Sequence, residues 1–197
     1  MFSLRELLRS PLSWIGLAGV AVGACAPALG DLLDGGAGTL TFVDSASGAT
    51  IVLDADDCEV DAGERLCPYD ATVTGTSGYD GDYGLLLAYG TGGQVALVEA
   101  TDEGRGTSFE GEMELLPSGL SKGDSERESE GGNVFSVELA EAGGTMDKPA
   151  GGTWSGCKTY KYIMGIRATE ALATVCAGDG LVGVALVNAG LEFVRTE

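Results

Sequence analysis

The chain has 197 residues, of which 44% are hydrophobic and 21% charged, and its formal net charge at pH 7 is −19. This length suits one domain with a real core, or at most two small ones. So acidic a surface repels phosphate backbones, which excludes nucleic acid as a partner. The chain contains no histidine, which excludes Ser-His-Asp and Cys-His catalysis and histidine-ligated zinc.

The first 25 residues have the layout of a secretory signal. A weakly basic start with Arg5 and Arg9 precedes an apolar run from Trp14 to Ala24, and Cys25 follows directly. The run is short for a membrane-spanning helix, which needs about 20 apolar residues. An uncleaved membrane anchor and an ordinary secreted protein are the alternatives to a cleaved leader with a modified cysteine.

Val22-Gly23-Ala24-Cys25 resembles the lipobox of bacterial lipoproteins, in which an aliphatic residue and two small residues precede the lipidated cysteine. The resemblance covers only the leader, and Val22 stands where Leu is commoner in that family. It implies that residues 1–24 are a signal peptide and that Cys25 carries lipid. It further implies a protein held on a membrane of the bacterial envelope and facing the periplasm or the exterior.

Four cysteines remain when Cys25 is set aside, and an even number in an exported chain is typical of two disulfides. Of the three possible pairings, Cys58–Cys67 and Cys157–Cys176 are favoured because each pair is local. A metal-thiolate site is the alternative, but the gaps are long for zinc. Trp154 is expected to pack beside the second disulfide.

Residues 25–38 are expected to be the lipidated cysteine with a flexible tether, and residues 39–197 a single β-rich domain. Alternating apolar and polar residues around glycine-rich turns predict hairpins. The predicted hairpins join residues 39–43 with 49–53, 83–89 with 94–99, and 181–187 with 191–195. Further strands are predicted at residues 71–74, 107–115 and 133–139.

Several segments lack such a pattern. The composition predicts a polar loop at residues 54–68, a long mobile loop at residues 117–132 and another loop at residues 143–152. The segment 158–176 is ambiguous: Tyr160, Tyr162, Met164 and Ile166 alternate as in a strand, whereas residues 168–175 have helical composition. We expect a strand first and a short helix after it. The predicted fold class is mainly β: an antiparallel sandwich or barrel built from hairpins, with at most one or two short helices and long Gly-rich or acidic loops.

Two groups of polar residues are candidate ligand sites. Alternating carboxylates can bind calcium, which makes the acidic loop a weak calcium site; its candidate ligands are Asp54, Asp56, Asp57 and Asp61. Aromatic rings beside acids can bind sugars by stacking and by accepting hydroxyl hydrogens; this candidate group is Tyr79, Asp80, Asp82 and Tyr83. Ordinary turn and strand residues are the competing interpretation of both groups.

The sequence as a whole favours a non-catalytic envelope lipoprotein with a structural or protein-recognition role. No catalytic residue and no cofactor is assigned, and the expected partners are the membrane, through the lipid at Cys25, and other envelope proteins or glycans. A carbohydrate- or calcium-binding module is the first alternative. A small hydrolase that uses paired carboxylates is the second, although the sequence cannot choose such a pair among so many acids.

Overall fold

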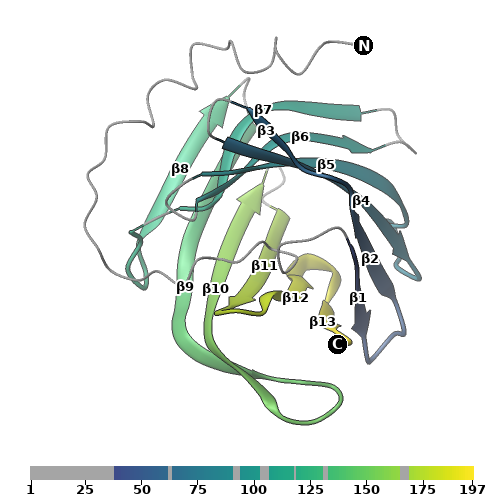
Figure 1. Cartoon of the computed structure of the whole chain (residues 1–197). Helices are drawn as coiled ribbons and strands as arrows, with labels where there is room; N and C mark the ends of the chain where they lie inside the picture. The colour runs from purple at the N-terminus through teal and green to yellow at the C-terminus, as the bar shows by residue number, and fades with distance from the viewer. Residues whose placement is uncertain are drawn as a thin grey trace.

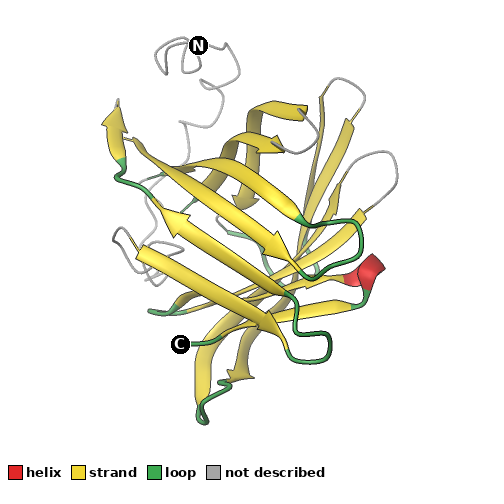
Figure 2. Cartoon of the chain, turned by 90° about the vertical axis from the view of Figure 1, so that its right-hand side faces the viewer, coloured by secondary structure: helices red, strands yellow, loops and turns green. Residues whose placement is uncertain are grey.

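The computed structural model describes residues 38–61, 64–90, 94–102, 107–117, 119–130, 133–164 and 169–197. The predicted signal peptide, Cys25 and most of the tether therefore lie outside the described residues. Within the described part, the regular structure is β apart from one turn of 3-10 helix, η2 (Val187–Ala189), drawn red in Figure 2. The prediction of a mainly β, antiparallel fold built from hairpins is confirmed.

The described strands form one large antiparallel sheet (Figure 1). They are β1 (Gly38–Asp44), β2 (Thr50–Ala55), β3 (Glu59–Asp61), β4 (Glu64–Thr74), β5 (Gly81–Tyr89), β6 (Val95–Asp102), β7 (Thr107–Leu116), β8 (Ser125–Glu130), β9 (Asn133–Asp147), β10 (Thr153–Met164), β11 (Thr169–Cys176), β12 (Gly180–Leu186) and β13 (Leu191–Arg195). The three predicted hairpins correspond to β1–β2, β5–β6 and β12–β13, and all three are present.

The order of strands across the sheet is β7-β6-β5-β4-β2-β1-β13-β12-β11-β10-β9-β8. β1 pairs with β13, so strands from the two ends of the described chain are neighbours in the middle of the sheet. β7 and β8 follow each other in the chain but lie at opposite edges, and the sheet is not closed into a barrel. Both strands are rich in glutamate. Pairing them would place like charges side by side, which is destabilising.

The sheet curls so that its two halves pack against each other (Figure 1). The largest core cluster contains buried residues of β4 to β7 together with buried residues of β9 to β11. Its members include Tyr69, Leu87, Leu116, Val137 and Tyr160. The Tyr162 hydroxyl also donates a hydrogen bond of 2.8 Å to the backbone oxygen of Leu115, which ties β10 to the edge strand β7. Two packed layers of one continuous sheet thus supply the core.

The middle of the sheet has a second, smaller core. Phe42 of β1, Ile51 of β2 and Phe193 of β13 are buried together with Ala49. Successive side chains of a strand point to opposite faces, and Phe42 therefore packs inward between two less buried neighbours. The pairing of Asp44 with Phe193 and of Phe42 with Arg195 fixes the register of β1 on β13.

The predicted helix at residues 168–175 is wrong in the described part, because Thr169–Cys176 forms β11. β11 pairs with β10 on one side and with β12 on the other. Ala171 and Val175 are buried and Ala173 packs on the core, at alternate positions. Burial and two ladders of hydrogen bonds outweigh the helix propensity of alanine, which is a weak preference.

Three loop predictions are also corrected. Residues 125–130 of the predicted mobile loop form β8, and residues 143–147 belong to the long strand β9. Part of the predicted polar loop 54–68 forms β3, and the last residues of that loop begin β4. β8 lies at the edge of the sheet, where a polar strand lacks the apolar alternation that predicts a half-buried strand.

Candidate functional site

In the predicted polar loop, two separate strands, β2 and β3, lie one after the other along the same side of β4. β2 pairs with residues 69–74 of β4, and β3 pairs with residues 64–66 of the same edge. The disulfide Cys58–Cys67 joins the chain to β4 between these two strands, and the Asp56 amide donates to the Pro68 oxygen at 3.1 Å. The pairing expected from the sequence is the one in the structure. β3 is therefore a short strand that the Cys58–Cys67 disulfide holds against β4.

The calcium candidates lie in and between β2 and β3. Asp54, Asp56 and Asp57 are exposed, and the Asp54 carboxylate accepts a hydrogen bond from the Thr39 hydroxyl. The side chain of Asp61 lies outside the described residues. Among the side chains that the structure describes, no group of three or more Cys, Asp and Glu is arranged to hold a metal ion. Calcium binding by this loop remains a prediction.

The sugar-site candidates form a turn that satisfies its own polar groups. The Asp80 carboxylate accepts hydrogen bonds from the backbone amide of Thr76 at 2.6 Å and from its hydroxyl at 2.7 Å. Asp82 accepts from the Thr72 hydroxyl at 2.9 Å. The Tyr83 hydroxyl donates to the backbone oxygen of Tyr79 at 2.8 Å. The four residues do lie together, but Asp80, Asp82 and Tyr83 have partners that stabilise the turn between β4 and β5.

Electrostatics in this turn follow from the same hydrogen bonds. The Thr76 hydroxyl, with help from the Thr76 amide, holds the pKa of Asp80 below its usual value. Hydrogen bonds to the ionised form favour that form. The ionised Asp80 is thus a structural element of the turn that precedes β5.

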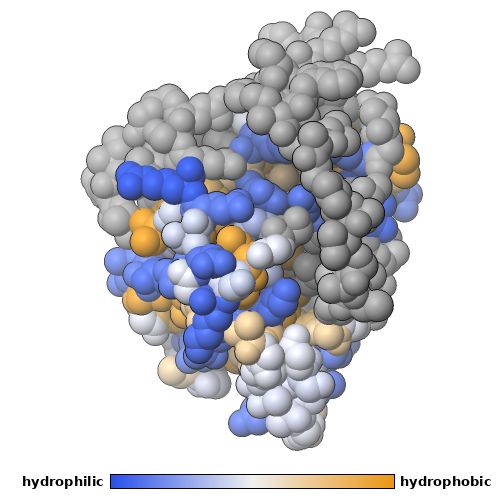
Figure 3. Space-filling model, turned by 90° about the vertical axis from the view of Figure 1, so that its left-hand side faces the viewer, coloured by the Kyte–Doolittle hydropathy of each residue, from blue (hydrophilic) through white to orange (hydrophobic). Residues whose placement is uncertain are grey.

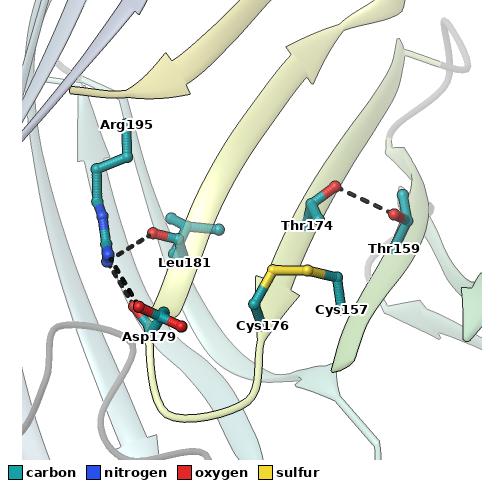
Figure 4. Close-up of a disulfide and its surroundings, with 7 residues drawn as sticks. All are labelled: Cys157, Thr159, Thr174, Cys176, Asp179, Leu181 and Arg195. Carbon is teal, nitrogen blue, oxygen red and sulfur yellow. Dashed lines mark hydrogen bonds and ion pairs between the residues drawn. A yellow bond between two sulfur atoms is a disulfide. The ribbon is translucent and has the colours of Figure 1, made fainter. Parts of the chain in front are cut away.

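The second disulfide, Cys157–Cys176, joins opposite positions of β10 and β11 (Figure 4). A β-bulge lies at this disulfide, because the register of β10 on β9 shifts on both sides of Cys157. Gly156 lies in that bulge with φ +64°, and a Cβ there would lie 3.2 Å from the Cβ of Ala177. Only glycine adopts this backbone readily. The bulge bends the far end of the β9–β10 hairpin, which extends beyond the rest of the sheet (Figure 1).

Trp154 packs against this disulfide, as predicted. It is 1% exposed and forms a core cluster with Cys157, Cys176 and Val182. Met146 of the same hairpin packs on this cluster. A side chain at Gly183 would also collide with Met146, because a Cβ built there lies 2.7 Å from its Cε. The end of the β9–β10 hairpin is thus folded onto β12.

Two cations flank Trp154. The Lys148 ammonium lies 5.3 Å and the Arg195 guanidinium 5.5 Å from the centre of the indole ring, within range for cation–π attraction. Arg195 also donates to the backbone oxygens of Asp179 and Leu181 (Figure 4) and forms an ion pair with the Asp179 carboxylate. Arg195 therefore joins the last strand to the β11–β12 turn. The Trp154 Nε1–H is buried and has no acceptor among the residues that the structure describes.

The edge strand β7 presents a feature that sequence reasoning did not single out. Met113 packs on the core, so Glu112 and Glu114 point to the outer face of the sheet. Partial desolvation raises the pKa of Glu112, and the negative charge of Glu64 raises it further. Only the fold brings Glu64 of β4 near Glu112.

The opposite edge of the sheet, β8, carries charges of both signs. The described side chains of β8 include Glu126 and Arg127, both exposed, so that edge carries both signs of charge. Figure 3 faces the side of the molecule on which β8 and β9 lie, and its coloured residues are largely hydrophilic with scattered hydrophobic ones. Mixed charges on an edge strand discourage pairing with other chains.

No helix in the described part of the chain is long and apolar enough to cross a membrane. No protein-family model and no curated protein sequence matches the chain.

Two solved structures are similar to it. One is described as a "putative exported protein with YmcC-like fold" from Bacteroides fragilis, with a TM-score of 0.48 and 14% identity over 81% of this chain and 93% of that chain. The other is described as a "putative lipoprotein" from Parabacteroides distasonis, with a TM-score of 0.46 and 13% identity over 84% of this chain and 97% of that chain.

Proposed function

We propose that the protein is an exported, lipid-anchored domain of the bacterial envelope that acts by recognising other proteins and not by catalysis. Lipid on Cys25 would hold it on a membrane, and the curled sheet would stand clear of that membrane on the tether. The acidic surface would keep neighbouring copies apart, because like charges oppose self-association.

The observation that carries this proposal is the pairing of cysteines. Both disulfides join positions that the sheet brings opposite each other, Cys58 with Cys67 and Cys157 with Cys176. Disulfides persist in oxidising compartments outside the cytoplasm. The fifth cysteine, Cys25, then stands alone at the end of a signal-like leader, which is the position that lipidation requires.

The proposal is tested by the mass and location of the mature protein. The membrane fraction of the producing cell should contain a chain that begins at Cys25 and carries added acyl mass, with no free thiol. The Cys25→Ser variant should lose the acyl mass and leave the membrane fraction, whereas a Cys58→Ser, Cys67→Ser double variant should stay membrane-bound. A wild-type chain that retains Met1, or that is released without modification, would contradict the proposal.

A further inference from the structure

The two disulfides lie in different surroundings. Cys157 and Cys176 are 4% and 1% exposed and pack with Trp154 in the core. Cys67 is fully buried, but its partner Cys58 is exposed. A thiol from outside the protein can therefore approach Cys58–Cys67 from the Cys58 side, whereas the core covers both cysteines of the other disulfide.

Backbone pairing is interrupted where this disulfide lies. The ladder between β2 and β4 ends one residue before Asp56, and the ladder between β3 and β4 begins one residue after Cys58. Across the intervening residues, the described backbone hydrogen bond runs from the Asp56 amide to the Pro68 oxygen, at 3.1 Å. Facing residues of an antiparallel pair can exchange two such bonds, but Pro68 has no amide hydrogen to return one. The Cys58–Cys67 disulfide is the covalent connection at this point.

β3 itself has little to hold it against the sheet. It has three residues and pairs with residues 64–66 of β4. Its Glu59 and Val60 side chains are exposed, that of Val60 by 75%. A two-stranded hairpin is marginally stable on its own in water. We therefore expect residues 56–61 to keep their place on β4 chiefly through the disulfide.

We propose that Cys58–Cys67 is a redox-sensitive switch. A protein dithiol of the Cys-x-x-Cys kind reduces it by attack at Cys58, and reduction releases residues 56–61 from β4. The released segment is acidic, so the switch changes the shape of an acidic part of the surface. The inference goes beyond the proposed envelope role and does not depend on the lipid.

The exchange balances in two steps. The first thiolate of the dithiol attacks the Cys58 Sγ and forms a disulfide between the two proteins. The electron pair of the broken bond leaves on the Cys67 Sγ, which takes up a proton. The second thiolate of the dithiol then attacks the first sulfur and releases Cys58, which is protonated in turn. Two electrons and two protons pass to this protein, and the dithiol becomes a disulfide.

Trapping the first step tests where the dithiol attacks. The probe is thioredoxin, a Cys-x-x-Cys protein, with its second active-site cysteine replaced by serine, and it is mixed with the oxidised mature protein. A mixed disulfide should form, and mass spectrometry of its peptides should place the thioredoxin sulfur on Cys58. A bond to Cys67, Cys157 or Cys176 would overturn the proposal. So would the absence of a mixed disulfide when the same probe reacts with the disulfides of insulin.

Hydrogen exchange tests what reduction does. After reduction by wild-type thioredoxin, the amides of residues 56–61 should exchange about tenfold faster or more, because this segment opens without the rest of the sheet. Exchange in β11 and β12 should stay unchanged, and reoxidation should restore the original rates. Unchanged exchange at residues 56–61 would overturn the proposal, because the disulfide would not hold the segment. Loss of protection throughout the sheet would also overturn it, because the disulfide would then be structural.

Two variants check the physical basis of the switch. The Cys58→Ser, Cys67→Ser protein should show the fast exchange of residues 56–61 without reductant, and slow exchange there would overturn the proposal. If this variant does not fold, wild-type protein alkylated at these two cysteines after mild reduction replaces it. Pro68→Ala supplies an amide that can donate to the Asp56 oxygen, so reduction should raise the exchange of the segment less than in the wild type. An equal rise would overturn the structural basis given for the switch.

The result on this disulfide is separable from the lipid anchor. The Cys25→Ser protein should form the same mixed disulfide at Cys58 as the lipidated protein, so failure of the anchor would leave this result intact. Conversely, a protein with acyl mass on Cys25 that yields no mixed disulfide would support the anchor and overturn the switch.

Discussion

Asp80 shows how an acidic residue that resembles a ligand can belong to the fold. Its carboxylate accepts two hydrogen bonds from Thr76, and these hold its pKa below the usual value. A group with a depressed pKa in the folded state stabilises the protein above its unfolded pKa of about 3.9. That stabilisation is lost as the pH falls through the lower pKa of the folded state.

We therefore expect Asp80→Asn to lower the stability at neutral pH and to flatten the loss of stability below about pH 4. The measurement is urea unfolding followed by circular dichroism at a series of pH values. Asp70→Asn is the control, since Asp70 is an exposed carboxylate of the neighbouring strand. If both variants lose stability at low pH as steeply as the wild type does, Asp80 does not stabilise the turn through its charge.

Single residues were predictable where local chemistry decides their environment. The cysteine pairs and the burial of Trp154 beside a disulfide followed from spacing and residue type. The proximity of Glu64 to Glu112 was not predictable, because these residues lie on strands that are not adjacent in the chain or in the sheet. The same holds for Arg195, which reaches Trp154 only because β13 returns to the centre of the sheet.

At the scale of the element, the bend of the β9–β10 hairpin depends on Gly156. We expect Gly156→Ala to destabilise the protein by about 1–2 kcal/mol, because alanine is strained at positive φ. The new methyl group would also press on Ala177. Gly144→Ala is the matched control on the facing strand, where an added Cβ meets only the Cys157 oxygen at 4.0 Å. Thermal unfolding of the two variants would show equal stabilities if the bulge were unimportant.

The two disulfides should differ in their access to reductant. Cys58 is exposed, whereas Cys157 and Cys176 are 4% and 1% exposed. A mild reductant should therefore open Cys58–Cys67 first, and mass spectrometry after alkylation should find the label on that pair before the other. Complete reduction under native conditions at equal rates would mean that the second disulfide is not shielded by Trp154. Loss of that disulfide by a Cys157→Ser, Cys176→Ser double substitution should cost about 2–4 kcal/mol.

The strands that could be predicted are those with one face on the core. The predicted strands correspond to β1, β2, β5, β6, β7, β12 and β13 and to parts of β4 and β9. β8 was missed because an edge strand with a polar sequence shows no such period, and β11 because its small residues resemble a helix. The partner strands that decide both cases lie in the tertiary structure and not in the local sequence.

For the whole molecule, the dominant property is a net charge of −19. Mutual repulsion of the carboxylates should destabilise the folded state, and salt should relieve it. Raising NaCl from 0.01 to 0.2 M shortens the screening length from about 30 Å to less than 10 Å. Over that range we expect Tm to rise by roughly 2–4 °C, which corresponds to about 1 kcal/mol for a domain of this size.

The dependence of Tm on salt concentration distinguishes charge screening from a general effect of salt. Screening saturates at moderate ionic strength, so the rise in Tm should level off, whereas a general salting-out effect continues to increase with concentration. Replacing several surface carboxylates by their amides should reduce the rise in proportion to the charge removed. A Tm that does not change with salt would mean that basic residues already balance the acids locally.

The pairing of β1 with β13 also bears on the export that we propose for this chain. The two halves of the sheet meet at this seam, where the Thr196 amide donates to the Thr41 oxygen at 2.9 Å. Until residues 191–195 have emerged, the seam is missing and the two halves of the sheet are not joined. Folding that waits for contacts so distant in the chain is slow. A translocation machine that handles unfolded chains would therefore receive this chain before its sheet could form. After export, a variant truncated before β13 should remain unassembled and sensitive to protease outside the cytoplasm.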